Sequence, residues 1–196
     1  MVKKRDETNA VKVDVALFCR IENVLRSSEN IVFILTSPDD IAGVLTAYKV
    51  SLKSGRIFVI DIDTAYALDK RRKTSKNIPE FDWRNVRIRF TPDQADAFSA
   101  NVSSKLLYHY NSGKINIFEI NKKKEHILVL LREETDLPDI VKDVRGVSGA
   151  CVICTARVDN LTDKFKNYCT AKGIRVERLV PLDPVAAEGK ENAGNP

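Results

Sequence analysis

Side chains that could bind a cation or a ribose follow two apolar segments that we predict to be buried strands. Asp61 and Asp63 end the segment RIFVIDID, and Ser37 and Asp39 follow the segment NIVFILTS. In open α/β sheets, ligands gather outside the carboxyl ends of the strands. The alternative is that Asp63 caps the next helix at Thr64 while Asp61 satisfies a loop. The candidate strand-end ligand site comprises Ser37, Asp39, Asp61, Asp63 and Thr64.

Other motifs of catalytic or metal chemistry are sparse. Cys151 and Cys154 have the spacing of a metal knuckle, but within a strand their side chains point to opposite faces, so we predict small core residues. His109 and His126 are the only histidines, too few for a hydrolytic di-metal site. Neither GxGxxG nor GxxxxGK[ST] occurs, which disfavours a nucleotide enzyme. We therefore expect no bound metal or cofactor, and no catalysis by the chain on its own.

Basic side chains form two runs. The net charge is +5 and the sequence pI is about 9.0, a mild excess that permits contact with nucleic acid without requiring it. The denser run lies between residues 70 and 76, and the second is Lys122–Lys124. Either could meet phosphates, and the alternative is a solvated helix face or loop. The candidate nucleic-acid-binding residues are Lys70, Arg71, Arg72, Lys73, Lys76, Arg87 and Arg89.

Apolar periodicity divides the chain into alternating strands and helices. We predict a first helix from about Lys12, a helix opened by Ser37 and Pro38 that ends at Gly55, and a helix opened by Thr91. Short apolar runs predict strands at residues 30–37, 56–63, 86–90, 126–132, 150–156 and 174–180, with a further edge strand at 114–120.

This alternation with short connections is typical of an α/β fold, with a mostly parallel sheet and helices on both faces in a Rossmann-like arrangement. We expect one domain over residues 12–183, between a flexible tail at 1–11 and a disordered tail at 184–196. The N-terminus is charged and has no signal-like apolar run, and nowhere do about 18 apolar residues follow one another. A cytoplasmic protein without membrane contact is therefore expected.

The segments GRIFVIDIDTAYALDK and NIPEFDWRNVRIRF resemble the β-CASP domain of metallo-β-lactamase-fold hydrolases, the RNA-processing branch that includes ribonuclease J-like enzymes. The flanking segments ENIVFILTSPDDIAGVLTAYKVSLKSG, HILVLLREETDLPDI and GACVICTARVDNLTDKFKNYCTAKGIRVERL extend the resemblance over residues 13–180. The residues that carry the central motif are Asp61, Thr64, Ala65, Tyr66, Pro79, Trp83, Arg87 and Arg89.

The chain departs from this family where the family holds its metal. No His-x-His-x-Asp-His signature occurs, and VPLDPVAAEGK stands where a Ser-Gly-His-Ala-like motif usually follows the last strand. Asp63 replaces the usual aromatic residue after the strand Asp. The resemblance therefore implies a non-catalytic module that binds or positions RNA, or docks onto a separate metallo-β-lactamase-fold subunit. Two alternatives remain, a protein-interaction module with an exposed apolar patch and a Mg²⁺-dependent small-ligand enzyme that uses Asp39, Asp61 and Asp63.

Overall fold

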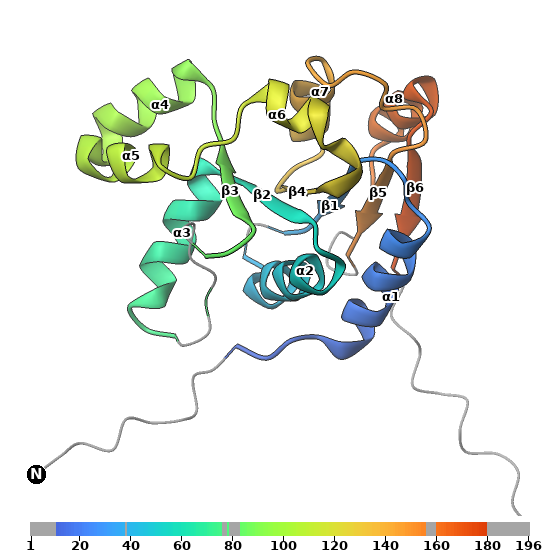
Figure 1. The fold of residues 1–196 in the computed structure, drawn as a ribbon, viewed down its shortest axis with the longest axis horizontal. Helices are drawn as coiled ribbons and strands as arrows, with labels where there is room; N and C mark the ends of the chain where they lie inside the picture. Colours follow the sequence, from blue (N-terminus) through green and yellow to red (C-terminus); the bar gives the residue numbers. More distant parts are fainter. Residues whose placement is uncertain (1–10, 38, 76–77, 79–82, 156–159, 180–196) are drawn as a thin grey trace, which may run out of the picture.

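Six parallel strands form one sheet in the order β3-β2-β4-β1-β5-β6 (Figure 1). The structure is a computed structural model, and it describes residues 11–37, 39–75, 78, 83–155 and 160–179. The predicted α/β class with a mostly parallel sheet is confirmed, since every pair of neighbouring strands is parallel. The strands are β1 (Val32–Leu35), β2 (Ile57–Asp61), β3 (Val86–Arg89), β4 (Ile127–Leu131), β5 (Cys151–Cys154) and β6 (Arg175–Arg178).

Helices cover both faces of the sheet. Successive strand residues point to opposite faces, so these apolar strands present apolar side chains on both sides. Val32 and Ile34 pack in the core on the first face, whereas Phe33 and Leu35 pack on the second face. The first face is covered by α1 (Val15–Arg26), α2 (Ile41–Ser54) and α3 (Ile62–Arg72), and the second by α6 (Ile117–Lys122), α7 (Asp136–Val141) and α8 (Asp163–Lys172).

A helical arm joins β3 to the rest of the chain and packs on the first-face core beside α3. It consists of α4 (Pro92–Phe98), a π-helical turn η2 (Ser99–Ser103) and α5 (Ser104–Asn111). The ring of Phe98 meets the ring of Tyr66 edge to face at 5.5 Å. The hydroxyl of Tyr110, a fully buried residue, donates a hydrogen bond to Asp69 at 2.6 Å. Burial and the Asp69 carboxylate both raise the pKa of Tyr110, so that the phenol stays neutral.

Local capping corrects three details of the predicted elements. The expected strand at residues 114–120 is wrong, because Asn116 and Glu119 form a capping box that opens α6. Asp40, rather than Ser37, caps α2 by accepting from the backbone N–H of Gly43. Asp61, rather than Asp63, caps α3.

Several predicted features fall outside the described residues. They are the last tail, nearly all of the first tail, and the residues Pro38, Lys76 and Pro79. Among the described residues, no helix combines the length and the apolar character that a bilayer crossing requires.

Candidate ligand site at the strand ends

The connections that leave β2 and β4 run to opposite faces of the sheet. The helix α3 follows β2 and packs on the first face through Ala65 and Leu68, while α7 follows β4 and packs on the second face through Leu137 and Ile140. Because β2 and β4 are neighbours, the two connections diverge to opposite faces directly at the carboxyl ends of these strands. In α/β sheets, such a switch point is where a crevice for ligands forms.

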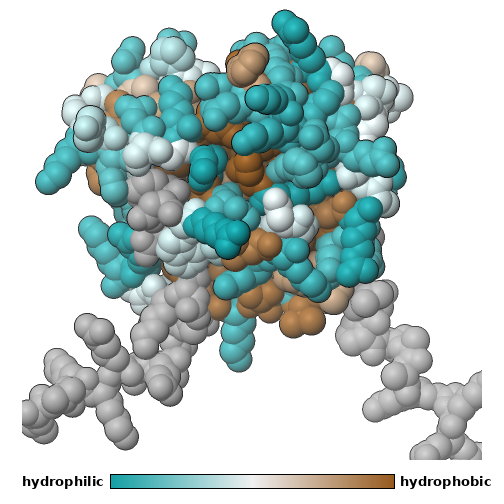
Figure 2. Space-filling view, in the orientation of Figure 1, coloured by the Kyte–Doolittle hydropathy of each residue, from teal (hydrophilic) through white to brown (hydrophobic). Residues whose placement is uncertain are grey.

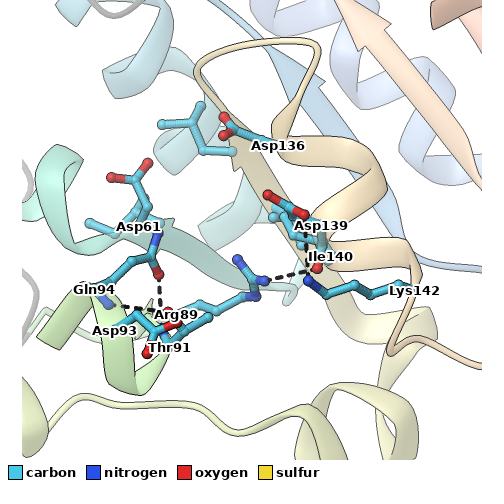
Figure 3. A pocket seen from close by; sticks show the side chains of 12 residues that line it. Asp61, Arg89, Thr91, Asp93, Gln94, Asp136, Asp139, Ile140 and Lys142 are labelled. Carbon is cyan, nitrogen blue, oxygen red and sulfur yellow. Dashed lines mark hydrogen bonds and ion pairs between the residues drawn. The ribbon is translucent and has the colours of Figure 1, made fainter.

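A pocket of about 270 Å³ lies at the carboxyl ends of β2, β3 and β4, against α4 and α7. In Figure 3 the side chains of Asp61, Arg89, Asp136 and Asp139 surround one hollow. Its apolar wall comes from β2, β4 and α7. Its polar groups come from the ends of β2 and β3, from the start of α4, and from α7 with its C-cap. The lining residues are Ile60, Asp61, Arg89, Thr91, Asp93, Gln94, Val129, Leu130, Asp136, Asp139, Ile140 and Lys142.

Arg89 is the main cation of this pocket. Its Nη2 donates to the backbone oxygen of Asp139 at 3.2 Å, and no other hydrogen bond or ion pair joins its guanidinium to the described residues. A guanidinium carries five N–H donors, so most of them remain available. Burial lowers the pKa of Arg89, while nearby carboxylates, above all those of Asp139 and Asp143, act in the opposite direction.

The pocket carboxylates differ in how fully they are engaged. Asp61 accepts from the backbone N–H and the hydroxyl of Thr64 at 2.7 and 2.8 Å. One oxygen of Asp136 accepts from two consecutive backbone N–H groups, those of Arg132 and Glu133. Among the described residues, the Asp139 carboxylate makes only a long contact of 3.4 Å with Lys142, and its side chain is 71% exposed. Asp139 therefore has more free capacity than Asp61 or Asp136 to accept hydrogen bonds from a ligand.

Arg132, at the end of β4, occupies the position that the sequence suggested for a cation. Its Nη1 lies 3.5 Å from Asp63 Oδ2 and 3.9 Å from Asp61 Oδ1. A Mg²⁺ ion at these two carboxylates would have to compete with a guanidinium that is already in place. Asp61 and Asp63 thus share an internal ion pair with Arg132 rather than an open cation site.

The other residues of the predicted strand-end site divide between two places. Ser37 and Thr64 line a second hollow of about 20 Å³, together with Thr36 and Arg132. A space of this size holds about one water molecule. Asp39 is exposed and lines neither of these two hollows.

The described members of the predicted nucleic-acid-binding set are not brought together into one surface. Lys70–Lys73 are all exposed at the end of α3, and the ammonium of Lys70 lies 4.2 Å from the centre of the Tyr66 ring. Arg87 and Arg89 alternate with Val86 and Ile88, which pack in the first-face core with α3. The two arginines therefore point to the second face, away from α3.

The second basic run is partly structural. Lys122 and Lys123 are exposed at the end of α6, but Lys124 donates to the backbone oxygens of Arg145 and Gly146 at 3.0 and 3.1 Å. Only two side chains of this run therefore remain free for an external phosphate, and the end of α3 offers the larger group.

The cysteines pack as predicted. Cys151 belongs to the first-face core and Cys154 to the second-face core. Burial raises the pKa of Cys154 to about 12 and that of Cys169 to about 11, so both remain thiols near neutral pH. Within the described ranges, no group of three or more His, Cys, Asp or Glu side chains is placed to hold a metal ion.

Comparison with known proteins assigns no family to this arrangement. No protein-family model matches the chain, and no curated protein matches it either. A function must therefore be argued from the residues themselves, above all from the exposed basic side chains and the pocket.

Proposed function

We propose that the chain is a β-CASP-like module that binds RNA and positions it, leaving hydrolysis to a separate metallo-β-lactamase-fold subunit onto which it docks. The observation that supports RNA binding is the group of four consecutive exposed cations, Lys70–Lys73, which we call the α3 basic cluster. The family resemblance supports the docking partner, because the chain lacks the histidine signature that such a partner would supply.

The α3 basic cluster has the properties of a phosphate-binding surface. Lys70, Arg71 and Lys73 form no ion pair with a described carboxylate, so none of the described anions neutralises them. The negative end of the α3 dipole favours cations, but only with about half an elementary charge. Most of the positive charge is thus left for an external polyanion, whose counterions would be released on binding.

Charge reversal at the α3 basic cluster tests RNA binding. The variant carries Lys70→Glu, Arg71→Glu and Lys73→Glu, and retains Arg72 because that side chain has an internal interaction. Affinity for a labelled single-stranded RNA, measured by fluorescence anisotropy over a salt series, should fall at least about tenfold at low salt. The slope of log K against log salt should shrink by roughly 2, at about 0.7 per lost contact.

A matched control keeps the same change in net charge. Lys164→Glu, Lys166→Glu and Lys172→Glu place it on α8, where all three side chains are exposed. The control should keep nearly the affinity and slope of the wild type. Equal binding by the charge-reversed α3 variant and the wild type would remove the basic cluster as the RNA site, and equal losses in both variants would reduce it to a net-charge effect.

A protein-interaction module remains the second candidate, because two helices expose aromatic side chains. Tyr108 on α5 is 83% exposed and Phe118 on α6 is 73% exposed. The face drawn in Figure 2 is mostly hydrophilic, with hydrophobic residues in small groups between charged ones. Large apolar patches are the usual mark of a permanent partner. The exposed aromatic residues therefore fit a transient contact better than a permanent one.

A further inference from the structure

The strand-end pocket places a guanidinium and a carboxylate next to each other at one opening. The link is direct, because Arg89 donates to the backbone oxygen of Asp139, whose own carboxylate stands above the guanidinium in Figure 3. Arg89 offers donors that no described residue uses, and Asp139 offers acceptors that only Lys142 contacts, at 3.4 Å. A ligand that fits both must therefore present acceptors and donors side by side.

The charges of the pocket argue against an anion. Four carboxylates, those of Asp61, Asp93, Asp136 and Asp139, line the hollow together with two cations, Arg89 and Lys142. Those of Asp61, Asp136 and Asp139 favour the charged form of Arg89. Because the carboxylates outnumber the cations, a phosphate that approached Arg89 would meet a net repulsion. A neutral ligand avoids this cost and still satisfies the guanidinium through lone pairs on oxygen or nitrogen.

The walls and the size indicate a flat ring. The apolar part of the lining suits the face of an aromatic heterocycle, and it consists of Ile60, Val129, Leu130 and Ile140. The volume of about 270 Å³ lies just below the range of drug-sized pockets, so it suits a nucleobase with part of its sugar.

We propose that this pocket binds a guanine base. Guanine carries the acceptors O6 and N7 on one edge, to which an arginine donates two parallel hydrogen bonds. The neighbouring edge carries the donors N1–H and N2–H, which a carboxylate accepts. Arg89 takes the first edge and Asp139 takes the second. Adenine presents an N6 amino donor where guanine has O6, and would set this donor against Arg89.

The guanine site deepens the proposed function, on which the assignment of this base to RNA rests. It gives the module a preference for guanine, whereas the α3 basic cluster holds phosphates without regard to sequence. The two sites can fail separately, because guanosine carries no phosphate and does not need the cluster. The charge-reversed α3 variant should therefore bind guanosine as the wild type does.

The test is equilibrium dialysis of the full chain against free nucleosides. Guanosine should bind with a Kd of about 0.1–1 mM, and at least tenfold more tightly than adenosine, cytidine or uridine. Inosine lacks the N2 amino group and should lose part of this affinity. The analogue 7-deazaguanosine lacks the N7 acceptor and should lose another part.

Two variants assign each edge to its residue. Arg89→Met should lower guanosine affinity at least tenfold, and should bind guanosine and 7-deazaguanosine equally. Asp139→Asn should lower it as well, and should no longer distinguish inosine from guanosine. The matched control is Asp163→Asn, since Asp163 pairs with Lys166 three residues on, as Asp139 pairs with Lys142. The control should leave binding unchanged, and circular dichroism verifies that each variant is folded.

Three results would overturn the guanine site. They are an absence of guanosine binding up to 1 mM, equal affinity for all four nucleosides, and displacement of guanosine by inorganic phosphate at equal concentration. None of them would change the interpretation of the charge-reversal experiment on the α3 basic cluster.

Discussion

Arg56 lies at the edge of the sheet where the strands begin, and Arg89 lies at the edge where they end. The surroundings of the two side chains differ sharply. Arg56 precedes β2 and is 5% exposed, and its guanidinium donates four hydrogen bonds to backbone oxygens. Arg89 ends β3 and donates one, to Asp139. In both residues, burial lowers the pKa of the guanidinium. The first arginine is thus enclosed by the fold, whereas the second is enclosed by the fold only in part.

The partners of Arg56 explain its place in the structure. The four backbone oxygens come from three segments that meet at one point. These segments are the end of α1, the connection from α1 to β1, and the start of β4. Two of them have a second donor, since Leu25 O also accepts from the backbone N–H of Ser28 and Asn30 O from the hydroxyl of Ser28. The acceptors are Leu25 O, Ser28 O, Asn30 O and Ile127 O, at 2.6–3.3 Å.

The difference between the two edges indicates which one stabilises the fold and which one is free to bind. A buried cation with four of its five donors directed at backbone oxygens has little capacity left for a ligand. A partly buried cation with spare donors beside a 270 Å³ pocket has that capacity. From the engagement of these two arginines, we call the amino end of the sheet its structural edge and the carboxyl end, which holds the proposed ligand site, its functional edge.

The largest expected effect is at Arg56. Arg56→Met removes a partly buried cation that donates to four backbone oxygens, two of them in buried bonds, and should lower the free energy of unfolding by about 3–5 kcal/mol. Arg56→Lys keeps the charge but not the planar fork, and should cost about 2 kcal/mol. Urea denaturation followed by circular dichroism measures both. A loss below about 1 kcal/mol in the Met variant would contradict the structural role of this edge.

An intermediate effect is expected at Asp61, which belongs to both the functional edge and the fold. Asp61→Ala removes the cap of α3 and should cost about 1 kcal/mol, whereas Asp61→Asn keeps a capping oxygen and should cost only a few tenths. Thermal melts of the two variants side by side give this difference. Equal melting temperatures would mean that the cap contributes nothing measurable.

The smallest expected effect is at Arg89. Arg89→Met removes a single hydrogen bond and one partly desolvated charge, and it should leave the free energy of unfolding within about 0.5–1 kcal/mol of the wild type. The same urea titration used for Arg56 applies. A loss as large as that of Arg56→Met would end the distinction between the two edges.

Periodicity was sufficient to predict the parallel sheet, because its strands are short apolar runs between helices. It failed at residues 114–120, where alternating Ile and polar residues suggest a strand but the capping box of Asn116 and Glu119 opens a helix. A side-chain hydrogen bond of this kind acts locally and overrides a weak alternation over seven residues.

The site was predictable only in part, for a topological reason. Asp61 could be placed at a strand end from its own segment. Arg132, Asp136 and Asp139 could not be joined to it, because no feature of the sequence shows that β4 lies beside β2. Their signal was their position at the end of a predicted strand or in the segment that follows it, which becomes informative once the order of the strands is known.

The central position of β1 has a consequence for how the chain is made. Both neighbours of β1 come from roughly a hundred residues downstream, since Val32 pairs with Leu128 and Cys151. A ribosome must therefore synthesise most of the polypeptide before this apolar strand can be covered on either side. A nascent chain that stalls before β4 presents two unpaired strand edges, which makes it a substrate for chaperones and prone to aggregation.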